Sequence, residues 1–215
     1  MSKSSIFVLD KNFKGTVICD FNNSHLFVPC IWDILLDKYY PDREILYYEK
    51  ECPVKVSLIH GGQKVWDELQ NRINKCNNFS DRLLWELSIQ QVFFGKDKEK
   101  VANAINDFLK TNKKYAKSPF DDSYLFDNEN IVHRFEEVRD EILQIDAPYF
   151  VFKITSCDDN VENWFLKYSE EDDDYLLNGS LKDKNDIVTY FIIIDDNIIG
   201  YCDNLSFCKE RGANV

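Results

Sequence analysis

The spacing of apolar residues changes along the chain, and this change constrains the fold more than any other feature. In the middle of the sequence apolar side chains recur at helical spacing, and the clearest stripe is Ile131, Phe135, Val138 and Ile142. Short β-rich runs lie nearer the two ends, at residues 5–10, 15–21, 149–154, 187–194 and 198–202. We therefore predict an α+β fold, with a mixed or antiparallel sheet that takes strands from both chain ends and with a helical middle section.

Other elements are predicted between these runs. The same spacing favours three further helices, at residues 24–40, 65–73 and 101–109. A strongly apolar helix is predicted to begin at the N-cap Ser80 and to include Val92 and Phe94. Two more strands are predicted at residues 44–48 and 54–59. His60-Gly61-Gly62 then favours a tight turn, or alternatively an anion-binding turn before a helix.

Residues 111–130 form the longest weakly patterned stretch of the chain. Weak patterning of this kind is typical of a connection between packed units. The 215 residues are enough for one domain with a substantial core. We therefore predict a single α+β domain over residues 1–215, with any subdivision falling near 111–130.

Negative charge is concentrated in the C-terminal half. The chain carries a net charge of −12. Residues 1–118 hold 18 Lys and Arg against 15 Asp and Glu, which is +3, whereas residues 119–215 hold 8 against 23, which is −15. An acidic chain has no electrostatic attraction for nucleic acid or for an anionic membrane, so neither is an expected partner. The acidity favours either simple solubility or a face that steers a basic protein partner.

Several classes of protein are excluded by what the sequence lacks. The longest uninterrupted apolar run, residues 190–194, is too short to span a membrane, and the first ten residues lack the apolar segment of a secretory signal. Seven cysteines, an odd number, favour reduced thiols over a disulfide framework. The sequence contains neither a P-loop nor a Rossmann fingerprint, and no His or Cys spacing suits zinc. We expect a cytoplasmic protein without a cofactor or a metal.

One cysteine is a candidate for catalysis. Cys30 follows Pro29 in the first turn of a predicted helix, where the helix dipole lowers the pKa of a thiol. With His25 or His60 as a base, it would form a thiol nucleophile. The other interpretation is a small apolar residue of the core. We do not predict an enzyme, and a nucleophile at Cys30 is the alternative.

Acidic residues of the C-terminal half gather in three short segments. They are Asp158 and Asp159, then Glu170, Glu171, Asp172, Asp173 and Asp174, and then Asp195 and Asp196. An exposed, solvated loop is the simplest interpretation. An EF-hand is excluded, because the sixth position counted from Asp172 is Leu177 instead of glycine. The sharper hypothesis is a partner-binding surface, with Trp164 as its apolar anchor. Dense carboxylates can occupy the phosphate-binding groove of a nuclease, because the Lys and Arg side chains that bind phosphate also bind carboxylates.

The chain as a whole resembles the immunity proteins of bacterial polymorphic toxin systems, including contact-dependent growth inhibition. The resemblance rests on overall character (small, acidic, α+β, reduced cysteines, no catalytic motif) and on the style of the segment from Asp20-Phe21-Asn22-Asn23-Ser24 through Trp32-Asp33. It implies a stoichiometric inhibitor of a cognate toxin domain, often a nuclease, that blocks the active site or an adjacent surface. The partner would be a basic protein that mates with the acidic C-terminal surface.

Overall fold

A six-stranded mixed sheet forms the centre of the molecule. The computed structural model describes residues 3–43, 45–49, 52–55, 57–117, 123–154, 166–177, 179–183 and 189–212. The sheet has the order β10-β9-β5-β6-β1-β2. Its strands are β1 (Lys3–Leu9), β2 (Gly15–Asn22), β5 (Val92–Phe94), β6 (Tyr149–Ile154), β9 (Tyr190–Asp195) and β10 (Ile198–Asp203). Every neighbouring pair is antiparallel except β5 and β9. The predicted α+β class, with strands from both ends of the chain, is confirmed.

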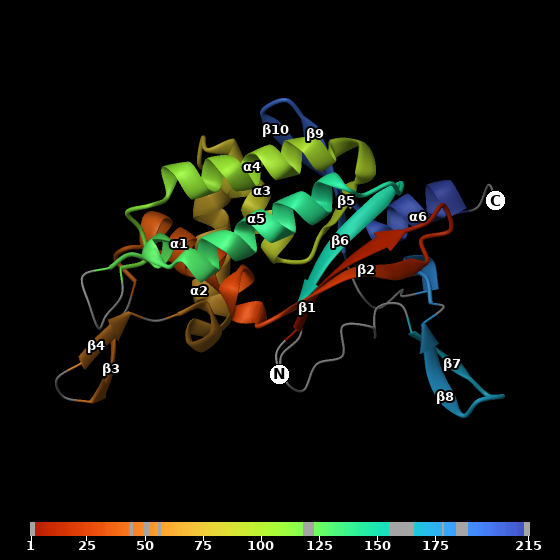
Figure 1. Ribbon diagram of the computed structural model, residues 1–215, viewed down its shortest axis with the longest axis horizontal. Coiled ribbons are helices and arrows are strands. Elements are labelled where there is room, and N and C mark those ends of the chain that lie inside the picture. The colour runs from red at the N-terminus through yellow and green to blue at the C-terminus, as the bar shows by residue number, and fades with distance from the viewer. Residues whose placement is uncertain are drawn as a thin grey trace.

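Among the described residues, helices α1 to α5 cover one face of the sheet and α6 packs on the other. The helices are α1 (Val28–Tyr39), α2 (Leu58–Asn74), α3 (Phe79–Ser88), α4 (Lys98–Thr111), α5 (Glu129–Leu143) and α6 (Asn204–Gly212). Short 3-10 turns are η1 (Ser24–Leu26), η2 (Gly95–Asp97), η3 (Leu125–Asp127) and η5 (Leu181–Asp183). Figure 1 shows α4 and α5 running side by side, with α1, α2 and α3 next to them. Helix α5 confirms the clearest helical spacing in the sequence, and strand β6 confirms the strand predicted at residues 149–154.

Alternation along the strands divides the apolar core into two clusters. Phe150 and Phe152 of β6 belong to the larger cluster, together with the buried faces of α1 to α5. Val151, between them, belongs to the smaller cluster on the opposite face. There Phe207 of α6 stacks on Phe191 of β9 with ring centroids 4.0 Å apart. The sheet is therefore buried on both faces over its central strands.

Two hairpins lie outside the main sheet. One is formed by β3 (Ile45–Glu49) and β4 (Cys52–Lys55), and the other by β7 (Leu166–Ser169) and β8 (Asp174–Leu177). Both pairs are antiparallel and form separate two-stranded sheets. In Figure 1 they extend from opposite sides at the bottom of the view, away from the six-stranded sheet.

The helix predicted to run from Ser80 to Phe94 is wrong in its second half. Helix α3 ends at Ser88, and Val92 and Phe94 belong to the buried strand β5. Gln90 turns the chain between them with a φ of +65°. A short apolar run suits a buried strand and a buried helix equally well, so spacing could not separate the two. The N-cap is Asn78, whose side chain accepts from Asp81 N, and not Ser80.

The strand predicted at residues 54–59 is also too long. Strand β4 ends at Lys55, and Leu58 already begins α2. This helix is interrupted at Gly62, whose φ of 61° and ψ of −164° favour glycine. The turn predicted at His60-Gly61-Gly62 is therefore present as a break within helix α2. Helix α6 was not predicted at all, because only Phe207 and Cys208 mark its buried side.

The weakly patterned stretch 111–130 does not separate the strands of the sheet into two groups that pair independently. Strands β1, β2 and β5 precede it and β6, β9 and β10 follow it, yet all six belong to one sheet. The Ala116 N–H donates to the carboxylate of Asp37 in α1 at 3.1 Å. Lys117 and Tyr124 also form an isolated antiparallel bridge.

Gly95, the residue directly after β5, is a position where a larger side chain should destabilise the fold. Gly95 donates its N–H to Pro148 O at 2.8 Å, and a Cβ on Gly95 would lie 1.8 Å from Ala147 O. Ala147 O and Pro148 O are both backbone atoms, so neither can move aside as a side chain could. We therefore expect Gly95→Ala to lower the free energy of unfolding by about 3 kcal/mol. Urea denaturation followed by tryptophan fluorescence measures this change. The matched control is Gly200→Ala, since a Cβ there would meet Ile193 Cβ at 3.6 Å and Ile193 O at 3.9 Å, both ordinary contact distances. Equal midpoints for the two variants would contradict the constraint.

Candidate functional site

The acidic run between β7 and β8 is displayed on an ordered hairpin turn. Ser169 Oγ donates to Asp172 Oδ2 at 2.8 Å, and the Asp172 N–H donates back to Ser169 Oγ at 3.3 Å. Asp173 has a φ of +52°, which closes the turn. Residues 170–174 are all exposed, as predicted for a solvated run. The hairpin therefore holds five carboxylates in a defined turn in contact with solvent.

A second acidic turn joins β9 and β10. Asp195 pairs with Ile198, so Asp196 and Asn197 form a two-residue turn. Asp196 takes the positive φ of +46° that such hairpin turns favour at their first central position. The side chains of Asp195 and Asp196 are exposed.

The two acidic turns lie far apart. In Figure 1 the β9–β10 hairpin is at the top of the molecule and the β7–β8 hairpin is at the bottom right. The described residues of the predicted partner-binding surface therefore lie in two separate hairpin turns. Asp158, Asp159 and Trp164 lie outside the described residues.

Exposed apolar side chains gather around β10, and the sequence analysis missed them. Seven large apolar side chains are exposed among the described residues, and five of these lie within β9, β10 and the start of α6. We call these five the β10 patch: Tyr190, Ile193, Ile198, Tyr201 and Leu205. Ile198 is 66% exposed, the largest value among them. The sequence did contain a signal for this patch. Consecutive residues are apolar at 190–194 and 198–199, whereas a strand with one buried face needs an apolar residue only at every second position.

One member of the β10 patch is anchored by a buried carboxyl group. Tyr201 Oη donates to Glu86 Oε1 of α3 at 3.0 Å. Glu86 is only 4% exposed, and this burial raises its pKa to about 7 despite the Tyr201 hydrogen bond and the nearby charge of Arg82. Burial likewise raises the pKa of Tyr201 to about 12. The phenol is thereby fixed at the edge of the sheet.

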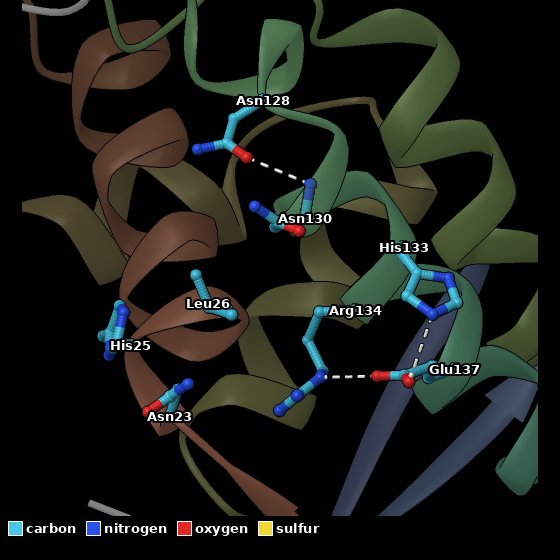
Figure 2. Close-up of a pocket in the computed structure, with 8 residues that line it drawn as sticks. All are labelled: Asn23, His25, Leu26, Asn128, Asn130, His133, Arg134 and Glu137. Carbon is cyan, nitrogen blue, oxygen red and sulfur yellow. Dashed lines mark hydrogen bonds and ion pairs between the residues drawn. The ribbon is translucent and has the colours of Figure 1, made fainter.

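A polar cavity of about 480 Å³ lies between η1 and the first half of α5. It is lined by Asn23, His25, Leu26, Asn128, Asn130, His133, Arg134 and Glu137. Figure 2 shows Arg134 and His133 both turned toward Glu137. The distances to the carboxylate are 2.7 Å from Arg134 Nε and 3.3 Å from His133 Nε2. The charged groups at this cavity are therefore paired with one another.

The surroundings of Cys30 do not favour a nucleophile. The residue is 4% exposed, and its thiol donates to the backbone carbonyl of His25 at 3.3 Å. Burial, with a contribution from Asp33, raises the pKa of the Cys30 thiol to about 12. A reactive cysteine requires a lowered pKa and access to substrate. Cys30 instead has the environment of a core residue, the other interpretation that its position allowed.

The remaining sequence candidates give no ligand site in the described part of the chain. The Gly61 N–H, one of the two amides expected at an anion-binding turn, donates to Ser57 O at 2.9 Å. Within the described ranges, no three or more His, Cys, Asp or Glu side chains are grouped so that they could hold a metal ion. Over the same ranges no helix has both the length and the apolarity to cross a bilayer. Comparisons with protein-family models, with curated proteins and with solved structures found no match.

The buried Glu86 predicts a pH-dependent stability. Its pKa of about 7 in the folded state exceeds the ordinary value of 4.5, so folding favours the protonated form. That contribution is complete below pH 4.5 and is lost as the pH rises through 7. Glutamine mimics the protonated form, so Glu86→Gln should be more stable than the parent at pH 8 by on the order of 3 kcal/mol. The two proteins should converge near pH 4.

Urea unfolding between pH 4 and pH 9 measures this difference. Glu99→Gln, at an exposed position of α4, is the matched control and should show no such trend. A stability difference between Glu86→Gln and the parent that stays constant with pH would contradict the assignment.

Proposed function

We propose that this protein is a stoichiometric protein-binding inhibitor, most specifically an immunity protein that neutralises a basic, nuclease-like toxin domain. The observation that carries the proposal is the β7–β8 hairpin. It presents the carboxylates of residues 170–174 in a turn fixed by Ser169 and by the positive φ of Asp173.

Such a hairpin suits a basic cleft for two physical reasons. A nuclease binds phosphate with Lys and Arg, and the same side chains form strong charge-assisted hydrogen bonds with carboxylates. The fixed turn also reduces the conformational entropy that would be lost when the carboxylates become ordered on binding. Carboxylates 170–174 would therefore face the phosphate-binding groups of the partner.

Charge alone does not give tight binding. Carboxylates at a solvent-exposed rim mainly accelerate association and exclude wrong partners, whereas buried apolar anchors supply most of the affinity. The β10 patch provides apolar side chains of this kind beside a second acidic turn, at Asp195 and Asp196. The two hairpins together offer both kinds of contact to a partner large enough to reach both.

Capture of the partner and charge reversal test this proposal. The tagged protein is used to isolate its partner from the cells that naturally produce it, and stoichiometry and Kd are measured by calorimetry. We expect a basic protein bound one to one, whose toxicity is suppressed when the two are produced together. Glu170→Lys with Glu171→Lys should weaken binding roughly tenfold or more at low salt, because two attractive charges become repulsive. Neither glutamate takes part in the Ser169–Asp172 hydrogen bonds that fix the turn.

The matched control is Asp67→Lys with Glu129→Lys, which makes the same change in net charge at exposed positions of α2 and α5, outside both hairpins. It should bind within about threefold of the parent. The proposal is overturned if the Glu170 and Glu171 variant binds as tightly as this control. A captured partner whose activity is unaffected by binding would overturn it as well.

A further inference from the structure

Strand β10 is an edge strand with little of the usual protection, since its one charged residue, Asp203, is the last residue of the strand. It ends the sheet order among the described strands, and it pairs with β9 over all six residues without a register shift. Its sequence, IIGYCD, contains no proline, no lysine and no bulge. These are the features that normally prevent an edge strand from pairing with another chain. No described strand pairs with the outer edge of β10, so its outward backbone groups can pair with a further strand.

The hairpin geometry defines which backbone groups face outward. The two-residue turn makes Asp195 and Ile198 a hydrogen-bonded pair, so the residues that alternate with Ile198 direct their N–H and C=O groups away from β9. In β10 these are Ile199, Tyr201 and Asp203. Ile194 of β9, the residue that pairs with Ile199, shows the same geometry. Its carbonyl points away from β10 and accepts a hydrogen bond from Lys100 Nζ at 3.1 Å.

Apolar surface lies on both faces beside this edge. Tyr201 and Tyr190 are in contact on the helix-covered face, with ring centroids 6.0 Å apart. Ile198 and Ile193 lie on the opposite face, where Gly200 pairs with Ile193. Because Gly200 has no side chain, Ile193 remains 46% exposed. A side chain from an added strand would cover Ile193 at this point.

The exposed face of Ile193 continues into a groove of about 300 Å³ toward α6. It is lined by Phe94, Ile193, Cys202 and Phe207, and also by the charged residues Lys96, Asp97 and Glu210. An apolar side chain of the added strand has space there that the chain itself does not fill. The edge therefore fits an extended segment with an apolar residue opposite Gly200.

Charge decides between the possible occupants. Asp195 and Asp196 lie at one end of β10 and Asp203 at the other. A second copy of the chain paired antiparallel along β10 would bring the acidic turn of each copy to the Asp203 end of the other, and each copy carries a net charge of −12. Like charges so placed oppose pairing. A cationic segment of a different protein meets the same carboxylates favourably.

We propose that the outer edge of β10 binds an extended segment of the basic partner protein, in which apolar residues are flanked by Lys or Arg. The segment would add a strand antiparallel or parallel to β10, through the backbone groups of Ile199 and Tyr201. This inference rests on the proposed function for its partner, and it assigns the contact to a surface separate from the β7–β8 hairpin.

Two measurements on the full chain test it, with the captured partner as the probe. Hydrogen exchange at the Ile199 and Tyr201 amides should slow about tenfold or more when the partner is added. Ile198→Lys should weaken binding roughly tenfold or more, because it removes an apolar contact and repels a cationic segment. The matched control is Ile18→Lys on β2, the opposite edge of the sheet, where the side chain is 44% exposed. It should bind like the parent.

The outcomes separate this inference from the proposed function. If Glu170→Lys with Glu171→Lys weakens binding but Ile198→Lys does not, and the two amides exchange equally fast in the complex, the β10 assignment is wrong and the inhibitor proposal stands. If no basic partner is captured, both are wrong. If the free protein sediments as a dimer with the two amides already protected, the edge belongs to a second copy and the inference is overturned.

Discussion

The rest of the structure depends on the three residues of β5. This strand pairs antiparallel with β6 and parallel with β9, and it is the one described strand that connects the β9–β10 hairpin to the rest of the sheet. Val92 and Phe93 are fully buried, one in each apolar cluster, so the strand also joins the two halves of the core. The close approach of Gly95 to Ala147 fixes where it ends. The position of the β10 patch follows from this short strand.

The helix layer is held by a buried charge that has no part in the proposed contacts. Asp81 of α3 is fully buried and accepts from Lys38 Nζ at 2.6 Å, from Tyr39 Oη and from Asn112 Nδ2 at 3.1 Å. These groups come from α1 and from the end of α4, so one carboxylate connects three elements. A buried carboxylate is tolerated only when its acceptor positions are satisfied in this way. The rigid helix layer in turn positions Glu86, which anchors Tyr201 at the sheet edge.

Apolar spacing predicted the secondary-structure elements that have long, regular patterns. It failed where an element is only a few residues long or where nearly all of its residues are apolar. Helix α5 and strand β6 follow from the spacing of Ile131 to Ile142 and from the run that starts after Pro148. The spacing places β5 in a helix because its three residues, of which Val92 and Phe93 are buried, are too few to show a period of their own. The acidic turn at 170–174 was predicted to be exposed, and it is. The distance between this turn and Asp195 and Asp196 depends on tertiary structure, which no local pattern contains. The β10 patch could not be predicted because nearly every position of that hairpin is apolar, so the exposed positions do not differ from the buried ones.

The proposed function separates two physical roles: carboxylates at two hairpin turns would attract the partner, and the apolar surface beside β10 would retain it. These roles affect different rate constants, because long-range charge acts on association and short-range contacts act on dissociation. The most direct test is the association rate constant with the captured partner, measured at roughly 0.05 M and 0.3 M salt. The account predicts a fall of about tenfold or more in the association rate constant, with little change in the dissociation rate constant. An association rate constant that is the same at both salt concentrations would contradict it.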